Sequence, residues 1–209
     1  MGGPEARLTL ASTSPQRRAI LEQLRIPFEA VAPTYVELDP PGLSPVELVR
    51  AHAEGKARSA HEDGVTLGVD TAVVLDGQVY GKPNGREDAA RILNELSSRT
   101  HSVVSGVCLL GPAFEAVEDA ATEVTFRPVS PELRALYLES GEWEGRAGAY
   151  AIQGLGGRLV ERLEGDYLNV VGLPGALLVS LLDRYAPSLI GRVDQASQRP
   201  VAEGRFTRP

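Results

Sequence analysis

The sequence predicts an α/β fold, and two observations support this class. Short strand-like segments alternate with segments whose apolar residues recur at helical spacing, from residue 7 to residue 185. The chain has 209 residues, of which 43% are hydrophobic and 23% charged, as is typical of a folded globular protein with a sizeable core. We expect residues 1–187 to form that domain and residues 188–209, which are polar and contain several arginines, to be a poorly ordered tail.

Cap and turn signals place the individual elements. In Ser14-Pro15 and Ser44-Pro45, the serine is a good N-cap and the proline fits the first helical position, so a helix begins at each pair. Asp76-Gly77 is typical of a hairpin turn. Strands are predicted over 7–11, 28–32, 65–75, 78–80, 103–110, 123–126, 158–163 and 168–171. Helices are predicted from 15, from 45 towards 60, and over 86–96, 131–140 and 174–185.

Composition and charge exclude several classes of function. The net charge of −7 argues against a broad nucleic-acid surface, although a local basic pocket for a small anion remains compatible with it. The longest apolar run, 170–182, is shorter than the ~20 residues of a membrane-spanning helix. A single cysteine, Cys108, excludes an internal disulfide framework, and its apolar strand predicts an inert buried thiol. We expect a cytoplasmic protein without nucleic-acid or membrane partners.

The segment 12–18 is the first candidate for chemistry. A strand ends there, hydroxyl side chains follow, and a helix begins with Arg17 and Arg18 in its first turns. Free backbone N–H groups and arginine forks at a helix start favour an anion such as phosphate. On this segment alone, a capped surface helix with solvated arginines is the better interpretation.

A second candidate pairs Asp70 with Lys82. Asp70 interrupts an apolar strand, where a carboxylate is costly unless it is paired, hydrogen-bonded or bound to a metal. The predicted hairpin can return Lys82 towards it, which gives a plausible centre for activating water or binding a metal. The alternative is a structural ion pair.

The glycine-rich stretch 148–157 is a third candidate, because four glycines in ten residues let a backbone approach a ligand closely. Its Gln153 offers both a donor and an acceptor to a base edge, and a flexible loop is an equally good interpretation. No phosphate-loop or hydrolase-elbow motif is present. For His52, His61 and His101, which lack metalloprotease spacing, we expect surface or structural roles.

Five segments in order resemble the Maf family of nucleotide pyrophosphatases. They are LASTSPQRR at 10–18, GVDT at 68–71, GKP at 81–83, AYAIQG at 149–154 and EGDYLNVVGLP at 164–174. The resemblance implies a mixed twisted sheet with flanking helices, in two lobes around a cleft, like the inosine triphosphate pyrophosphatases. It also implies hydrolysis of a nucleoside triphosphate to monophosphate and pyrophosphate with Mg²⁺ or Mn²⁺, and a homodimer.

The resemblance also assigns roles to residues. Asp70 matches the carboxylate taken as the general base, and Lys82 is the second catalytic candidate. Thr71 and Gln153 match the pair that marks the branch preferring dTTP and UTP, and Gln16 occupies a specificity position where many members have Arg. The phosphate- and metal-handling positions are matched by Ser12, Arg17, Glu37, Lys56 and Lys82, with Glu37 and Asp70 as metal ligands.

Three alternatives to a dTTP and UTP pyrophosphatase are open. One is a nucleotide-binding regulator of cell division with little turnover. Another is a pyrophosphatase of the 7-methyl-GTP type, and the third is a phosphatase that removes the terminal phosphate. An intact Asp70 and Lys82 argue against mere binding, because a carboxylate beside phosphates does not help affinity.

Overall fold

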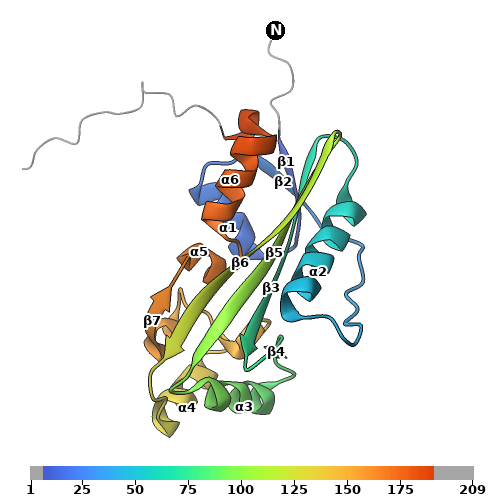
Figure 1. Ribbon diagram of the computed structural model, residues 1–209. Coiled ribbons are helices and arrows are strands. Elements are labelled where there is room, and N and C mark those ends of the chain that lie inside the picture. Colours follow the sequence, from blue (N-terminus) through green and yellow to red (C-terminus); the bar gives the residue numbers. More distant parts are fainter. Residues whose placement is uncertain (1–6, 191–209) are drawn as a thin grey trace, which may run out of the picture.

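A seven-stranded mixed sheet forms the centre of the protein, whose computed structural model describes residues 7–190 (Figure 1). The strand order is β2-β1-β3-β5-β6-β7, and β4 pairs with β3. β1 runs parallel to β2 and β3, whereas the other pairs are antiparallel. The strands are β1 (Leu8–Ala11), β2 (Phe28–Val31), β3 (Val65–Leu75), β4 (Gln78–Tyr80), β5 (Thr100–Gly111), β6 (Phe114–Phe126) and β7 (Val160–Glu164). The predicted α/β class with a mixed sheet is confirmed.

The helices begin where the cap signals predicted. Ser14 caps the first helix, and Ser44 caps the second in a reciprocal capping box with Glu47. The helices are α1 (Pro15–Gln23), α2 (Pro45–Ala60), α3 (Arg86–Leu96), α4 (Pro131–Glu139), α5 (Tyr167–Val171) and α6 (Gly175–Tyr185). No helix in the described part of the chain is long and apolar enough to cross a membrane.

Two apolar clusters occupy the two ends of the long strands β3, β5 and β6. Figure 1 shows β1, β2, α1 and α6 at one end and α3 and α4 at the other. The first cluster includes Leu67 of β3 and Leu181 of α6, and the second includes Val73 of β3 and Leu93 of α3. The sheet therefore joins two lobes, each with its own buried core.

Helix α2 lies unusually close to the sheet. A Cβ at Gly68 of β3 would stand 2.0 Å from the carbonyl oxygen of Ala53, and one at Gly106 of β5 would stand 2.2 Å from that of Val49. Only glycine fits at these two positions, because any larger residue would push the helix away. This close approach brings the inner face of α2 directly over Asp70, which pairs with Gly106 in the sheet.

The edge of β3 is open in its middle. β1 pairs with β3 only as far as Leu67, and β4 joins the same edge from Val73 onward. Residues 68–72 consequently have a strand neighbour on one side only, which is β5. Successive side chains of a strand point to opposite faces, so this gap makes both Asp70 and Thr71 accessible from one opening.

Three sequence-based expectations need correction. The stretch 168–171 is helix α5 and not a strand, because the Asp166 side chain caps it by accepting from the Leu168 N–H. Strand β6 begins at Phe114, well before the predicted residue 123. At the C-terminus, Pro187–Leu189 forms a 3-10 turn with Leu189 buried, while residues 191–209 of the predicted tail lie outside the described residues.

Candidate active site

A cleft of about 690 Å³ opens at the gap in the β3 edge. Its lining comes from the β1–α1 turn, the segment before α2, α2 itself, β3, the residues after β4, and the loop around 144–153. Arg18 is exposed and does not line the cleft. The structure brings to this one cleft the nine residues to which the family resemblance assigns roles. They are Ser12, Gln16, Arg17, Glu37, Lys56, Asp70, Thr71, Lys82 and Gln153.

Asp70 is held by a lysine on α2. The Lys56 Nζ lies 2.6 Å from Asp70 Oδ1 and 2.7 Å from Glu37 Oε1, so one ammonium bridges two carboxylates. Burial raises the pKa of Glu37, but the hydrogen bond and charge of Lys56, with His52 and Lys82, bring the pKa below its ordinary value. Glu37 is therefore ionised at neutral pH, and the carboxylates keep their geometry before any ligand binds.

The group also includes His52, a residue for which the sequence predicted only a surface or structural role. Its side chain is 5% exposed, with Nδ1 3.4 Å from Asp70 Oδ2. Its Nε2 faces two oxygens, Leu38 O at 3.1 Å and Asp39 Oδ1 at 3.5 Å, so Nε2 carries a hydrogen and donates it. Both ring nitrogens of His52 therefore face oxygen atoms, and Nδ1 is the one turned towards Asp70. The signal was the spacing of His52 and Lys56, four residues apart on one helix face.

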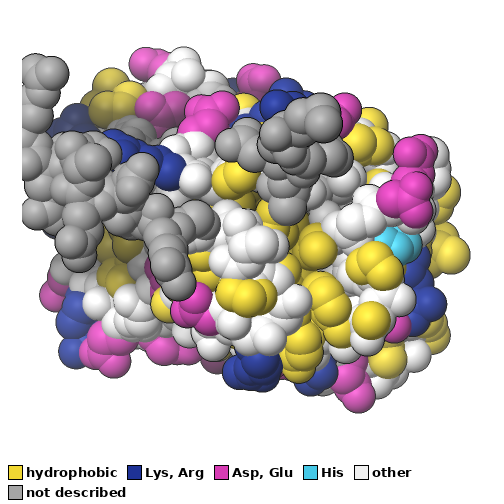
Figure 2. Space-filling view, turned by 90° about the horizontal axis from the view of Figure 1, so that it is seen from above, with side chains coloured by type: hydrophobic (Ala, Val, Ile, Leu, Met, Phe, Trp, Pro, Cys, Tyr) yellow, Lys and Arg dark blue, Asp and Glu magenta, His cyan; other side chains and the backbone are white. Residues whose placement is uncertain are grey.

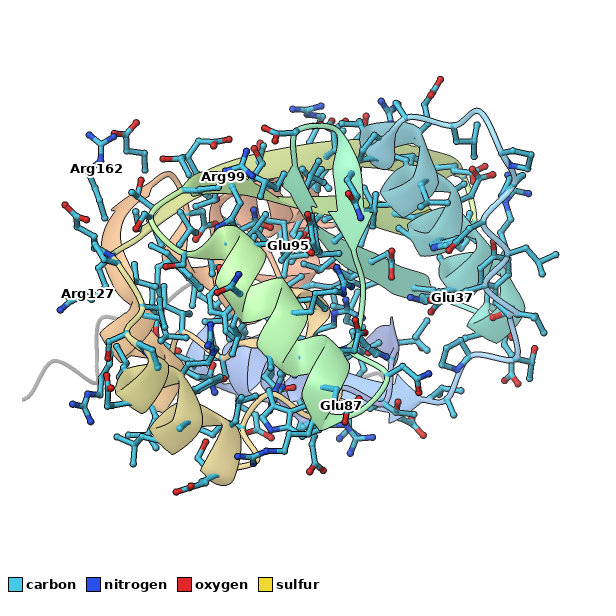
Figure 3. The ribbon with its side chains drawn as sticks, turned by 90° about the horizontal axis from the view of Figure 1, so that it is seen from below. Glu37, Glu87, Glu95, Arg99, Arg127 and Arg162 are labelled. Atoms are coloured by element: carbon cyan, nitrogen blue, oxygen red, sulfur yellow. The ribbon has the colours of Figure 1, made fainter. Side chains whose placement is uncertain are left out.

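The segment that carries Glu37 is fixed against α2 at two points. The ring of Tyr35 lies over Gly55, where a Cβ would stand only 2.3 Å from a ring carbon. Leu38 accepts the hydrogen bond from His52. Figure 3 shows Glu37 beside α2, at the far end of the view from Arg127 and Arg162. Gly55 therefore serves the packing of Tyr35, which directs Glu37 to Lys56.

Arg17 joins three parts of the cleft. Its Nε donates to Gly172 O at 2.9 Å, and its two terminal nitrogens donate to Ser12 Oγ at 3.3 Å and Thr71 Oγ1 at 3.4 Å. Burial lowers the pKa of Arg17, and the charges of Asp70 and Glu37 oppose that shift. The guanidinium stays positive, so it contributes a fixed charge beside the helix start.

Lys82 is not the ion-pair partner of Asp70, contrary to the structural alternative considered from the sequence. Lys82 is exposed at the cleft, it makes no ion pair within residues 7–190, and its charge reaches Glu37. Gln153 is also exposed, whereas the Thr71 hydroxyl is engaged with Ser105 Oγ at 2.9 Å. Gln16 accepts from the Ser14 hydroxyl at 3.2 Å. Of these side chains, Lys82 and Gln153 make no hydrogen bond or ion pair with another described residue.

A divalent cation fits the group formed by Glu37, His52 and Asp70. One ligand atom from each lies within 4.8 Å of the others. Carboxylate oxygens suit Mg²⁺ and Mn²⁺, and a ligating imidazole commonly donates its other N–H to a backbone carbonyl, as His52 does to Leu38. A bound cation would share the two carboxylates with Lys56.

The single cysteine, Cys108, and the two other histidines, His61 and His101, have structural roles. Cys108 is fully buried, and burial raises its pKa to about 12, which confirms the predicted inert thiol. His61 Nδ1 contacts Thr66 Oγ1 at 3.0 Å, and His101 is buried against Tyr150.

Comparison with known proteins identifies the family. The model of the family described as Maf-like protein matches residues 7–185. The chain belongs to the Maf family. Curated Maf relatives named dTTP/UTP pyrophosphatase include one from Gloeobacter violaceus, 43% identical over 86% of this chain and 96% of its own length. A second is from Moorella thermoacetica, 43% identical over 90% of this chain and all of its own.

Solved structures similar to this Maf chain include a HAM1 protein from Coxiella burnetii. The two are 17% identical with a TM-score of 0.41, over 57% of this chain and 72% of that one. The Ham1 protein of Staphylococcus aureus gives a TM-score of 0.42 at 14% identity, over 57% and 71% of the two chains.

Proposed function

We propose that this protein hydrolyses dTTP and UTP to the nucleoside monophosphate and pyrophosphate, as part of nucleotide-pool housekeeping. The observation that carries the proposal is the Lys56-bridged pair Asp70 and Glu37 in a cleft that also holds Arg17 and Lys82. Maf relatives at 41–43% identity that are named dTTP/UTP pyrophosphatase support the substrate class. The cations gathered in the cleft are consistent with this function, because a protein with a net charge of −7 needs local positive charge to bind a polyanion.

Asp70 is the proposed general base. It would orient a water molecule and accept its proton while the water oxygen bonds to the α-phosphorus. The bond from that phosphorus to the bridging oxygen breaks, and its electron pair leaves with pyrophosphate. Lys56 keeps the Asp70 carboxylate in position, and Arg17 offers positive charge from the helix start.

Glu37, His52 and Asp70 are the proposed ligands of Mg²⁺ or Mn²⁺. Such an ion, when bound, supplies positive charge that stabilises phosphate oxygens during the transfer. His52 adds a nitrogen to the oxygen ligands Glu37 and Asp70 that the resemblance implied.

Gln153, together with Thr71 and Gln16, is proposed to determine the preference for pyrimidine nucleotides. The exposed amide of Gln153 can donate and accept at a uracil or thymine edge. A missing partner in a site built for hydrogen bonding costs about 1–3 kcal/mol, which is enough for clear discrimination. Equal kcat/KM for dTTP, GTP and 7-methyl-GTP would contradict this part of the proposal.

The decisive experiment measures pyrophosphate and orthophosphate released from a panel of nucleotides with Mg²⁺. One pyrophosphate and one dTMP per dTTP is the expected result. Orthophosphate release would indicate a terminal phosphatase, and tight nucleotide binding without turnover would indicate a regulator. The proposed homodimer and cytoplasmic location rest on the family resemblance and cysteine usage, and light scattering of the purified chain tests the dimer.

A further inference from the structure

The cations of the cleft fall into two groups. Lys56 bridges Asp70 and Glu37, and Arg17 uses its nitrogens on Gly172, Ser12 and Thr71. Lys82 and Arg146 also line the cleft, but neither makes an ion pair with another residue of the described range 7–190. These two side chains therefore carry the positive charge that is available to a ligand.

Arg146 has an unsatisfied donor at the cleft. Its Nε is buried and has no hydrogen-bond partner among the described residues, which holds for only two other buried side-chain atoms in that range. Buried donors are normally satisfied, because one left unpaired destabilises the folded protein. The terminal nitrogens of the same guanidinium are not buried, and they too have no hydrogen-bond partner among the described residues, so an anion in the cleft can accept from them.

The backbone around Arg146 is fixed next to Lys82. The Gly148 N–H donates to Gly81 O at 3.1 Å, and the Ala149 N–H donates to Arg146 O at 3.1 Å. Ala149 is fully buried with a φ of 59°, which is a strained conformation for alanine. The fold thus holds this loop in a costly shape that presents Arg146 and Lys82 to the same opening.

We propose that Arg146, acting with Lys82, binds the pyrophosphate part of the substrate and stabilises it as the leaving group. This inference rests on the proposed function and adds Arg146 as a substrate-binding residue. The guanidinium fork matches two non-bridging phosphate oxygens, and the Lys82 ammonium adds a point charge. When the bond between the α-phosphorus and the bridging oxygen breaks, the new negative charge appears on this pyrophosphate.

The test uses inorganic pyrophosphate as the probe, with binding measured by calorimetry in Mg²⁺. In Arg146→Gln we expect pyrophosphate to bind at least about tenfold more weakly, because a charge-assisted hydrogen bond is lost. Binding of dTMP should stay within about twofold of wild type. Arg146→Lys should lie between, since it keeps the charge and loses the fork. The matched control is Arg158→Gln, which removes an exposed arginine outside the cleft.

The outcomes separate this inference from the proposed function. Unchanged pyrophosphate binding in a folded Arg146→Gln protein would overturn the inference about Arg146. The inference would also be overturned if the wild-type protein binds pyrophosphate no better than orthophosphate. A thermal melt of each variant checks folding, and Arg146→Lys provides the second variant if the first is unstable. If dTTP yields no pyrophosphate in wild type, the proposed function fails on that assay instead.

Discussion

Two walls of the cleft differ in how their charges are satisfied. On the paired wall, which we define as Glu37, His52, Lys56 and Asp70, every charged group contacts another. On the open wall, defined as Lys82 and Arg146, no ion pair forms within the described chain. The paired wall therefore has its geometry before substrate arrives, which suits a general base, whereas the open wall is completed only by an anion.

Chelating the proposed divalent cation should have the largest effect, because its three proposed ligands, Glu37, His52 and Asp70, all belong to the paired wall. We expect turnover to be abolished in excess chelator and restored by Mg²⁺ or Mn²⁺, with the protein still folded. Pyrophosphate release and circular dichroism on the same sample measure both. Full turnover in excess chelator would exclude a metal from the mechanism.

Asp70→Asn removes the central carboxylate of the paired wall. The kcat should fall by at least about a hundredfold, since general-base assistance is worth about 10²–10⁴ in rate. Nucleotide affinity should be kept or increased, because a negative charge beside the phosphates is gone. Melting temperature, affinity and pyrophosphate release are measured together, with the exposed Asp63→Asn as control. Near-normal release would leave Glu37 as the carboxylate to study.

His52→Gln tests whether the paired wall holds a metal ion. We expect Mn²⁺ to bind about 10–100-fold more weakly, the range typical for losing a group that ligates or orients a metal site. Mn²⁺ titration followed by electron paramagnetic resonance measures this without turnover. His61→Gln, a histidine outside the cleft, is the control. Equal Mn²⁺ affinity in both variants would assign His52 a purely structural role.

Replacing His101 should change the pH dependence of stability and leave kcat unchanged. Burial lowers its pKa to about 4, so between pH 6.5 and 4 the unfolded chain binds a proton that the folded protein excludes. The free energy of unfolding therefore falls as pH drops through this range, by roughly 3 kcal/mol for His101. In His101→Phe that component should be missing, while kcat at neutral pH is kept. Urea unfolding at several pH values checks the slope, and identical slopes would contradict the assignment.

Much of the fold was predictable because its signals are local. The Asp76-Gly77 turn and the 3.6-residue period gave β3, β4 and α3 with the bounds that the structure has. Helix α5 was not predicted, since the segment 168–171 is too short to show a period and its Asp166 cap lies just outside it. The first half of β6 was missed because its Glu, Asp and Ala residues favour no strand on their own.

The candidate site was predictable where residue type and motif agreed, as for Asp70 and Lys56. His52 was missed because its partners, Leu38 and Asp70, are brought to it only by the close packing of α2 on the sheet. Arg146 was missed for a related reason, since its unsatisfied Nε exists only in the folded loop. On the face seen in Figure 2, acidic and basic side chains are interspersed.

We propose that the paired wall directs water to the α-phosphorus while the open wall holds the leaving pyrophosphate. Hydrolysis of dTTP in H₂¹⁸O tests this directly, because the label marks the phosphorus that water attacks. We expect one ¹⁸O atom in dTMP and none in pyrophosphate, read by mass spectrometry after a single turnover. Label in pyrophosphate or orthophosphate, with none in dTMP, would contradict it.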